Sequence, residues 1–197
     1  QVITPSHTAT GTVLAIINTG ATPIFVDIDE STFNINCDLI SRVINKKTKA
    51  IVAVHLYGQP CEMDKIMYYS KKYKIPVIED CSQAAGSVFN NKKIGSIGLF
   101  GCFSFFPTKN LSSYGDGGLV STDNKVLANK IRSLKEYGWN KNRDAIFQGI
   151  NSRLDELHAS VLNIKLKFLQ IHNSERRLIA SRYNNEIWLN IPTSNVV

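Results

Sequence analysis

The stretch KAIVAVHLYGQPCEMDKIMYYSKKYKIPVIED, from Lys49 to Asp80, decides the fold. It opens with a short apolar run at 50–54, continues through residues with helical spacing at 62–73, and closes with a second apolar run at 75–80. Parallel strands need a crossover connection of about a dozen residues or more, which is usually a helix. The stretch therefore predicts two buried parallel strands joined by a helix.

The same alternation of strand and helix extends in both directions along the chain. Further strands are expected at 1–3, 22–29, 101–106 and 118–122, and further helices at 10–19, 37–45 and 124–137. Gly20 is a natural stop for the first of these helices, and Asn36 can cap the second. The predicted fold class is α/β, with a mostly parallel mixed sheet and helices on both faces.

The chain divides into two parts by the character of its sequence. Residues 1–153 carry the alternation of strands and helices, whereas the segment 154–197 begins as a long helical run. We expect 1–153 to form the sheet domain and 154–197 to form connecting helices that leave it. The chain opens on QVITP without an initiator Met and stops at Val197 without a closing element, so we expect it to be a fragment.

Composition is typical of a soluble globular protein, with 43% hydrophobic and 20% charged residues. The net charge is +7, but the lysines are spread along helix-like segments and no basic stripe is interleaved with aromatics, which disfavours a nucleic-acid surface. No apolar run reaches the roughly 18 residues of a membrane span, and no signal peptide is visible at Gln1. Cysteines at 37, 61, 81 and 102 form no CxxC pair and no zinc pattern, so we expect reduced thiols, a cytoplasmic location and no metal.

Polar side chains follow several predicted strands, at the edge of the sheet where open α/β proteins bind ligands. They are Asp27, Asp29, His55, Glu79, Asp80 and Ser104. Adjacent strand residues point to opposite faces, so Glu79 is expected to face away from Asp80. Asp80 has two interpretations: a carboxylate that pairs with a charged group in the strand-end crevice, or the N-terminal cap of a helix beginning in CSQAAG.

The segment SFFPTKNLSSYGDGG, residues 104–118, holds a lysine that differs from the lysines of ordinary surface runs. Lys109 lies between Pro107 and a glycine-rich turn, so local rigidity sets its position. It can be a surface lysine of a loop, or an amine directed into the strand-end crevice, where desolvation and a nearby cation lower its pKa. Ser104, five residues earlier, is placed to hydrogen-bond a phosphate.

Taken together, IEDCSQAAGS (78–87) and FGCFSFFPTKNLSSYGDGG (100–118) resemble the DegT/DnrJ/EryC1/StrS family of aminotransferases, which act on nucleotide-linked keto sugars. The likeness extends to GATPIFVDID, AIVAVHLYGQPCEMD and GINSRLDELHASVLNIKLKFL, and so covers nearly the whole chain. The resemblance implies the large domain of a fold-type I aminotransferase with pyridoxal 5'-phosphate as cofactor, and a small C-terminal domain that is largely missing here. It also implies glutamate as the amino donor and a homodimer with shared active sites.

The resemblance also assigns roles to five residues. Lys109 matches the Schiff-base lysine, and Asp80 matches the acid that pairs with the pyridinium nitrogen. Gln83 matches a glutamine beside the hydroxyl group of the cofactor ring, and Ser104 matches a ligand of the cofactor phosphate. Asn151 matches an asparagine that reaches across the dimer to the neighbour's cofactor phosphate, although Asn151 can also cap the helix that follows it.

Two features depart from the family pattern. Where an aromatic residue or a histidine often stacks on the cofactor ring, this chain has Ala9, with His7 two residues away. The Gly-Thr pair of the family's first phosphate loop belongs upstream of Gln1.

The sequence is compared with three alternatives to an aminotransferase by the residues that each would need. A sugar dehydratase of the same family has histidine in place of the lysine, which Lys109 argues against. A nucleotide-binding dehydrogenase lacks support because no G-x-G-x-x-G opens a helix. A non-catalytic cofactor-binding protein remains open.

Overall fold

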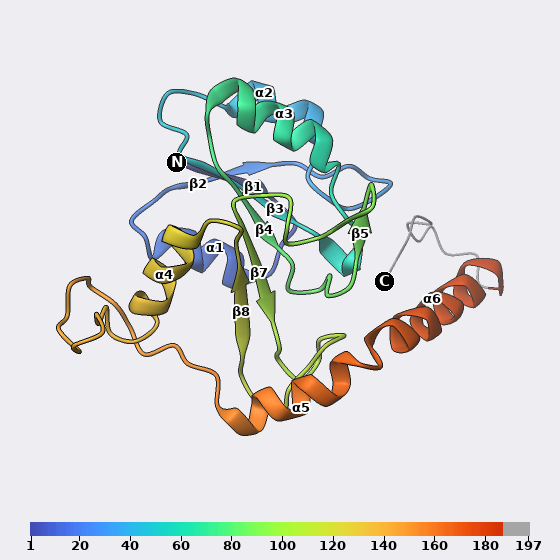
Figure 1. Cartoon of the computed structure of the whole chain (residues 1–197). Helices are drawn as coiled ribbons and strands as arrows, with labels where there is room; N and C mark the ends of the chain where they lie inside the picture. Colours follow the sequence, from blue (N-terminus) through green and yellow to red (C-terminus); the bar gives the residue numbers. More distant parts are fainter. Residues whose placement is uncertain (187–197) are drawn as a thin grey trace.

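The computed structural model describes residues 1–186 of the 197-residue chain. The last part of the expected helical segment 154–197, residues 187–197, lies outside the described residues. At the centre is a six-stranded sheet in the order β2-β1-β3-β4-β7-β8, with helices on both faces (Figure 1). The predicted class, α/β with a mostly parallel mixed sheet, is confirmed.

The strands of this sheet are short and mostly parallel. Their bounds are β1 (Val2–Pro5), β2 (Pro23–Val26), β3 (Ala50–Val54), β4 (Val77–Asp80), β7 (Phe100–Ser104) and β8 (Gly118–Ser121). The pairs β1–β2, β1–β3, β3–β4 and β4–β7 are parallel, whereas β8 runs antiparallel to β7. The carboxyl ends of β3, β4 and β7 therefore meet at one edge of the sheet, as the strand-end argument requires.

The helices form two layers around the sheet. Their bounds are α1 (Thr10–Ile17), α2 (Cys37–Val43), α3 (Met63–Tyr73), α4 (Lys125–Leu134), α5 (Glu156–Leu166) and α6 (Leu169–Glu186), with a 3-10 turn, η1 (Leu56–Gly58), after β3. On one face, Ile51 of β3 belongs to a core cluster with Ile40 of α2 and Ile66 of α3. On the other face, Val52 belongs to a cluster with Ile16 of α1. The alternation of side chains along β3 thus serves both layers.

Side-chain caps fix where two of the helices begin. The Asn36 side chain accepts a hydrogen bond from the amide of Asp38 at 3.1 Å, so Asn36 caps α2 as predicted. Asn124 caps α4 by accepting from the amides of Val126 and Leu127. Each cap satisfies amides that the helix itself leaves without partners.

The helical run expected from Leu154 is two helices rather than one. The chain turns at 167–168, between α5 and α6, through amides that donate three residues back. Leu162 of α5 and Leu169 of α6, seven residues apart on either side of the turn, belong to the same core cluster.

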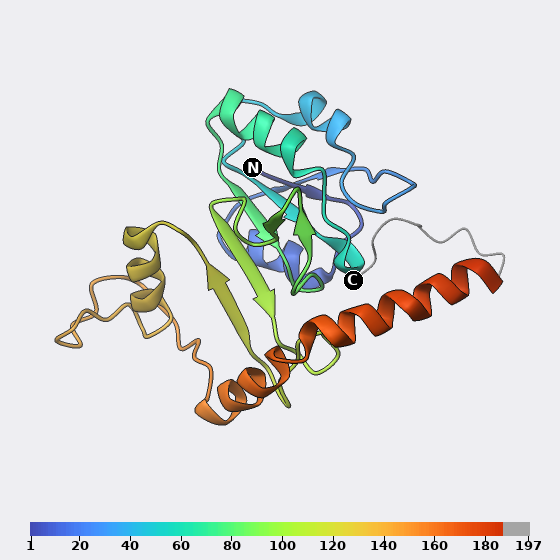
Figure 2. The same cartoon turned by 45° about the vertical axis from the view of Figure 1, so that its right-hand side comes forward.

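That second core cluster lies beneath the loop that joins β7 to β8. It consists of Ala85, Phe105, Leu111, Leu162 and Leu169. In both ribbon views α5 runs under this loop and α6 leads away from the sheet (Figures 1 and 2). Within residues 1–186, no helix is both long and apolar enough to cross a lipid bilayer.

A small hairpin between β4 and β7 was not predicted from the sequence. It consists of β5 (Val88–Phe89) and β6 (Lys92–Lys93), joined by Asn90 and Asn91. Both asparagines have positive φ, 47° and 63°, which is the geometry of a type I′ turn. The only signal for it in the sequence was the pair of asparagines. Strands of two residues are too short to show an alternation of apolar and polar side chains.

Candidate active site

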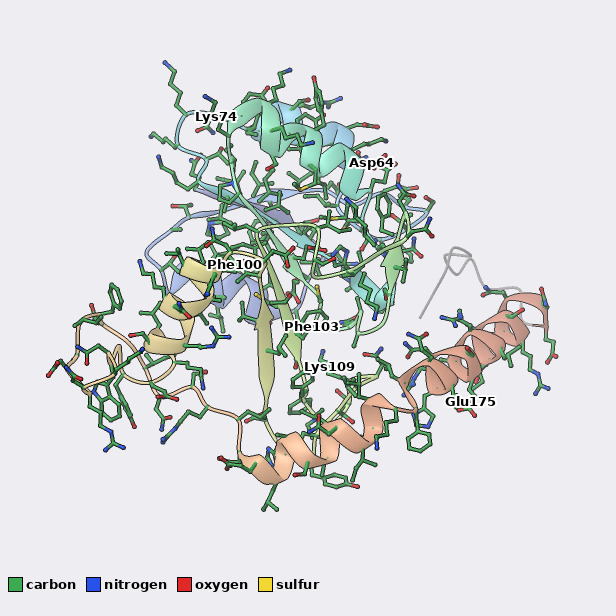
Figure 3. The ribbon with its side chains drawn as sticks, in the orientation of Figure 1. Asp64, Lys74, Phe100, Phe103, Lys109 and Glu175 are labelled. Atoms are coloured by element: carbon green, nitrogen blue, oxygen red, sulfur yellow. The ribbon has the colours of Figure 1, made fainter. Side chains whose placement is uncertain are left out.

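A cavity of about 560 Å³ opens at the carboxyl ends of β3, β4 and β7 and extends between α1 and the sheet. Four of the five predicted site residues line it: Asp80, Gln83, Ser104 and Lys109. The volume is within the range of small-molecule sites, roughly 300–1,000 Å³. Figure 3 shows Lys109 beyond the carboxyl end of β7, beside the junction of α5 and α6.

Two donors hold the carboxylate of Asp80 in the cavity. Its Oδ2 accepts from the Thr12 hydroxyl of α1 at 2.7 Å, and its Oδ1 accepts from the amide of Ser82 at 3.1 Å. The Thr12 hydroxyl in turn accepts from Thr8 at 2.8 Å. The residues after Asp80 form turns and not a helix, so the helix-cap interpretation is wrong. The hydrogen bond from the Ser82 amide caps a turn. The carboxylate can accept further hydrogen bonds, and it lines the cavity.

The backbone of Tyr57 orients Gln83. The amide of Tyr57, whose φ of 55° is left-handed, donates to Gln83 Oε1 at 2.7 Å. Among the described residues the amide nitrogen of Gln83 has no hydrogen-bond partner. Gln83 therefore presents a free N–H donor at the cavity wall, beside Asp80.

A tight turn places Lys109. Its amide donates to the carbonyl of Phe106 at 2.9 Å, and the amide of Ser113 donates to the carbonyl of Phe105 at 2.8 Å, which closes the base of the loop. The side chain is half-buried, and Nζ has no hydrogen bond or ion pair within residues 1–186. Ser104 Oγ accepts from the Phe106 amide at 3.3 Å, so its hydroxyl hydrogen remains available to a ligand.

Glu79 faces away from the cavity, as the strand alternation predicted. It is fully buried, and its carboxylate accepts from the amides of Gly95, Ile97 and Gly98 at 2.9, 2.8 and 2.6 Å and contacts His55 Nε2 at 3.2 Å. Burial raises the pKa of Glu79, but the hydrogen bonds from His55 and the amides outweigh burial and leave the pKa below its ordinary value. These bonds make Glu79 a structural carboxylate.

His55 borders the cavity, but its imidazole is fully buried on the Glu79 side. Its Nδ1 accepts from the amide of Cys61 at 3.1 Å, so Nε2 carries the proton that is donated to Glu79. Cys81 Sγ lies close to both side chains. Because protein donors already occupy the Glu79 carboxylate, we interpret this cluster as a structural support of the cavity floor.

The thiols are poor nucleophiles in the folded protein. Burial raises the pKa of Cys37 to about 12 and that of Cys102, which lines the cavity, to about 11. Burial also raises the pKa of Cys61 and Cys81 well above the ordinary range. All four cysteines are free, as expected. The unpaired amine of Lys109 is therefore the candidate nucleophile of the cavity.

Asn151 lies outside the group of residues that line the cavity. It is exposed, forms an isolated bridge with Glu136, and accepts from Arg153 Nε at 2.9 Å. The residue at the N-cap of α5 is Asp155, so the helix-cap interpretation of Asn151 is wrong. Within one chain, Asn151 contributes nothing to the cavity.

The position expected to hold a stacking ring is small. Ala9 lines the cavity, whereas His7 is exposed and makes edge-to-face contacts with Phe33 and Tyr57. The ring centroids of these two pairs are 6.2 and 6.4 Å apart. His7 therefore packs against neighbouring rings at the cavity mouth, and the wall at Ala9 stays open.

The mostly parallel sheet with a cavity at the carboxyl ends of its strands is the arrangement of an α/β protein that binds a ligand there, and comparison with known proteins identifies the family. Residues 1–191 match the DegT/DnrJ/EryC1/StrS aminotransferase family, and the chain belongs to it. A dTDP-3-amino-3,6-dideoxy-alpha-D-galactopyranose transaminase from Aneurinibacillus thermoaerophilus is 46% identical over 196 residues, which are 98% of this chain and 54% of that protein.

Two solved structures confirm that this is a fold-type I aminotransferase domain. DesV of S. venezuelae, in complex with a ketimine intermediate, has a TM-score of 0.91 and 38% identity over 95% of this chain and 50% of its own. NtdA from Bacillus subtilis, with bound cofactor PMP, has a TM-score of 0.87 and 35% identity over 94% of this chain and 42% of its own. The chain spans about half the length of the curated relatives it matches.

Sequence reasoning missed the residues that support the site. Thr12 carries no motif, although its spacing of four residues from Thr8 is a weak signal that the two hydroxyls meet. Asn173 was also missed; it follows the buried Leu169 by four residues and is itself fully buried, which is unusual for an amide.

Proposed function

We propose that the full-length protein is a pyridoxal 5'-phosphate-dependent aminotransferase that moves an amino group from glutamate to a keto group of a nucleotide-linked deoxy sugar. One observation carries the proposal: in a chain of this family, Lys109, Asp80, Gln83 and Ser104 line a single cavity. These side chains come from segments up to 29 residues apart (109 − 80), so their convergence is a property of the fold.

The residues at the cavity fit the cofactor. Lys109 offers an amine without a competing partner, Asp80 a carboxylate already held by two donors, and Gln83 a free amide N–H. Ser104 offers a hydroxyl hydrogen for a phosphate oxygen. The set matches the needs of pyridoxal phosphate, which are an amine for the aldehyde carbon, an acid for the ring nitrogen and donors for its oxygens.

Lys109 has two tasks in the proposed reaction. Bound pyridoxal phosphate supplies a carbonyl that an amine can attack and a protonated ring that draws electrons from the bond being broken. Lys109 Nζ would hold the cofactor covalently, and the same amine, when free, would move a proton at the donor's α-carbon. General acid–base transfer of this kind contributes about 10²–10⁴ in rate.

Asp80 keeps the proton on the ring nitrogen. A fixed negative charge favours a protonated base within hydrogen-bond distance, because charge-assisted hydrogen bonds are the stronger kind. The Thr12 hydroxyl and the Ser82 amide prevent the carboxylate from rotating away. Gln83 would position the ring hydroxyl group, since its own carbonyl oxygen is already engaged by Tyr57.

The open wall at Ala9 supports a bulky acceptor. The cavity is largely apolar on the side of α1 and the sheet, and no large side chain at position 9 narrows it. The relative with 46% identity is described as acting on a dTDP-linked sugar, which supports a nucleotide-linked keto sugar as the acceptor here.

A homodimer in the cytoplasm completes the proposal. Asn151 is exposed and stands next to Ile150, whose side chain is 68% exposed, a combination that favours coverage by another subunit. In this arrangement Asn151 donates its amide to the cofactor phosphate of the neighbouring subunit. Four free cysteines, three of them buried, support a reducing compartment.

The test is the half-reaction with glutamate. Full-length protein loaded with pyridoxal phosphate and mixed with glutamate, without any keto sugar, should release about one 2-oxoglutarate per subunit. A sugar dehydratase that does not use glutamate, or a non-catalytic cofactor-binding protein, would release none. A panel of dTDP- and UDP-linked 3-keto and 4-keto sugars, added afterwards, then identifies the acceptor by mass.

A further inference from the structure

A fully buried asparagine on α6 connects two parts of the candidate site. Asn173 is 0% exposed, although most of α6 is polar and exposed. An amide is buried at a cost unless it is hydrogen-bonded, so the partners of Asn173 indicate its role.

Those partners come from two loops of the cavity. Asn173 Nδ2 donates to the carbonyl of Ala85 at 3.1 Å, and Asn173 Oδ1 accepts from Asn110 Nδ2 at 3.3 Å. Asn110 Nδ2 also donates to the carbonyl of Ala85, at 2.7 Å. The three groups form a closed triangle that joins α6, the β4–β5 loop and the β7–β8 loop.

Each loop in the triangle carries a residue of the candidate site. Asn110 directly follows Lys109, and Ala85 is two residues after Gln83 on the loop that begins at Asp80. The triangle therefore sets how far the lysine stands from the acid and the glutamine. Within residues 1–186, the only other side chain that links the two loops by a hydrogen bond is that of Asn110 itself, which also belongs to the triangle.

The surroundings make the triangle rigid. Ala85 belongs to the second core cluster and Asn173 is fully buried, and hydrogen bonds are stronger where water is excluded. Gly86 has φ +92°, and a Cβ there would lie 2.9 Å from Asn173 Nδ2, so the β4–β5 loop approaches α6 as closely as a glycine allows.

Asn110 has a reason to leave this arrangement if the triangle is broken. Its Oδ1 is buried and has no hydrogen-bond partner among the described residues. A buried acceptor without a partner is costly, and a rotation toward solvent would relieve the cost. The bonds to Asn173 and to Ala85 are what hold Asn110, and with it the Lys109 turn, in place.

We propose that Asn173 is a positioning residue, which fixes the separation of Lys109 from Asp80 and Gln83 by bridging their loops. The link between the loops stands on the geometry alone, whereas its meaning for the reaction rests on the proposed function. The two can fail separately, and the experiments are chosen accordingly.

The first experiment measures amide hydrogen exchange in the cofactor-free, full-length protein. Asn173→Ala should speed exchange in residues 82–87 and 106–113, and leave α3 at 63–73 unchanged. Ser174→Ala, an exposed neighbour on the same helix, is the matched control and should change neither loop. Faster exchange in α6 alone, or a uniform increase throughout, would mean a merely structural role and would overturn the proposal.

The second experiment is a double-mutant cycle between Asn173→Ala and Asn110→Ala. The readout is the rate at which pyridoxal phosphate becomes trapped on the protein by borohydride. Each single variant should slow trapping about tenfold, and the double variant should be no slower than either, because both changes break the same link. If the losses add, so that the double variant traps the cofactor about a hundredfold more slowly, the two residues do not act through one link.

Asn110→Ala also guards against misfolding, because it breaks the triangle without changing a residue of α6. If Asn173→Ala does not fold, Asn110→Ala must still loosen residues 82–87, or the link is refuted. If the unaltered protein traps no pyridoxal phosphate, the proposed function is wrong. The hydrogen-exchange experiment then still shows whether Asn173 joins the two loops.

Discussion

At the scale of single residues, the site depends on two adjacent carboxylates with opposite tasks. Asp80 lies in the cavity with two fixed donors, whereas Glu79 is buried on the other face of β4 and binds three backbone amides and His55. The alternation of side chains along a strand separates them, and this much could be predicted from the sequence. The hydrogen bond from Thr12 to Asp80 could not be predicted, because Thr12 lies on α1 and meets Asp80 only in the folded chain.

The charge of Asp80 is the first prediction. Asp80→Asn keeps the shape of the side chain but removes the negative charge that holds the ring proton. Pyridoxal phosphate should still attach to Lys109, and the glutamate half-reaction should slow by about 100-fold or more. Stopped-flow absorbance of the loaded full-length protein measures this rate. A half-reaction near the unaltered rate would reduce Asp80 to a cap of the turn at Ser82.

The second prediction concerns Glu79 and pH. Its pKa is lowered from the ordinary 4.5 in the folded protein, so Glu79 contributes stability above pH 4.5 that is lost as pH falls through the lower, folded value. Glu79→Gln should lower the free energy of unfolding at pH 7 by about 3 kcal/mol and flatten its dependence on pH below 5.

Urea unfolding of the full-length protein between pH 3 and pH 8 measures both effects. Glu30→Gln, at an exposed acid in a loop, is the matched control and should have little effect at any pH. Equal stability of Glu79→Gln and the unaltered protein at pH 7 would show that the buried network around Glu79 is dispensable.

At the scale of elements, the close approach of β7 to the loop after the hairpin supports the cavity floor. A Cβ on Gly101 would lie 2.4 Å from Gly95 Cα and 2.5 Å from its carbonyl oxygen, which are backbone atoms that cannot move aside. This approach leaves Glu79 and the Gly95 amide within hydrogen-bond distance. The requirement is for small size and not for a special φ.

The third prediction follows from that contact. Gly101→Ala should destabilise the full-length protein by about 1–3 kcal/mol, as an overpacked core does. Gly11→Ala is the control: nothing lies within 4 Å of its Cβ, and alanine in α1 should be neutral or stabilise by up to about 1 kcal/mol. Thermal unfolding compares them. Similar shifts for both variants would contradict a specific contact at Gly101.

Helices and strands could be predicted where the hydrophobic periodicity was long and a cap marked the start of the element. They could be predicted less well where the element was short or its end unmarked. The strands of the sheet and the cap Asn36 follow from apolar runs and local chemistry. The break at 167–168 does not, because neither a glycine nor a proline marks it and the apolar residues around it keep helical spacing. The hairpin is too short to show alternation, and only its turn residues signalled it.

At the scale of the whole molecule, four predicted site residues converge in one cavity and the fifth does not. Asp80, Gln83, Ser104 and Lys109 follow strands whose carboxyl ends share an edge, so topology alone brings them together. Asn151 lies beyond β8 and α4, where no strand-end rule applies. Its role as a bridge between subunits stays a prediction from the family resemblance.

Subunit complementation tests that role. Full-length Lys109→Ala and Asn151→Ala subunits, each weakly active alone, are mixed and re-formed. If sites are shared across an isologous dimer, one site of each mixed dimer carries both changes and the other carries neither, so about half of the normal activity per mixed dimer returns. If mixing restores nothing while mass measurements detect the mixed dimer, Asn151 acts within its own chain.

The most direct test of the account is to locate the cofactor on the chain. Full-length protein is incubated with pyridoxal phosphate, reduced with borohydride, digested and analysed by mass. We predict one modified lysine per subunit, Lys109, and no specific modification in Lys109→Ala, with Lys71→Ala, at an exposed helical lysine, labelled like the unaltered protein. Modification of another lysine in its place, or equal labelling of Lys109→Ala, would contradict the assignment of this cavity as a pyridoxal phosphate site.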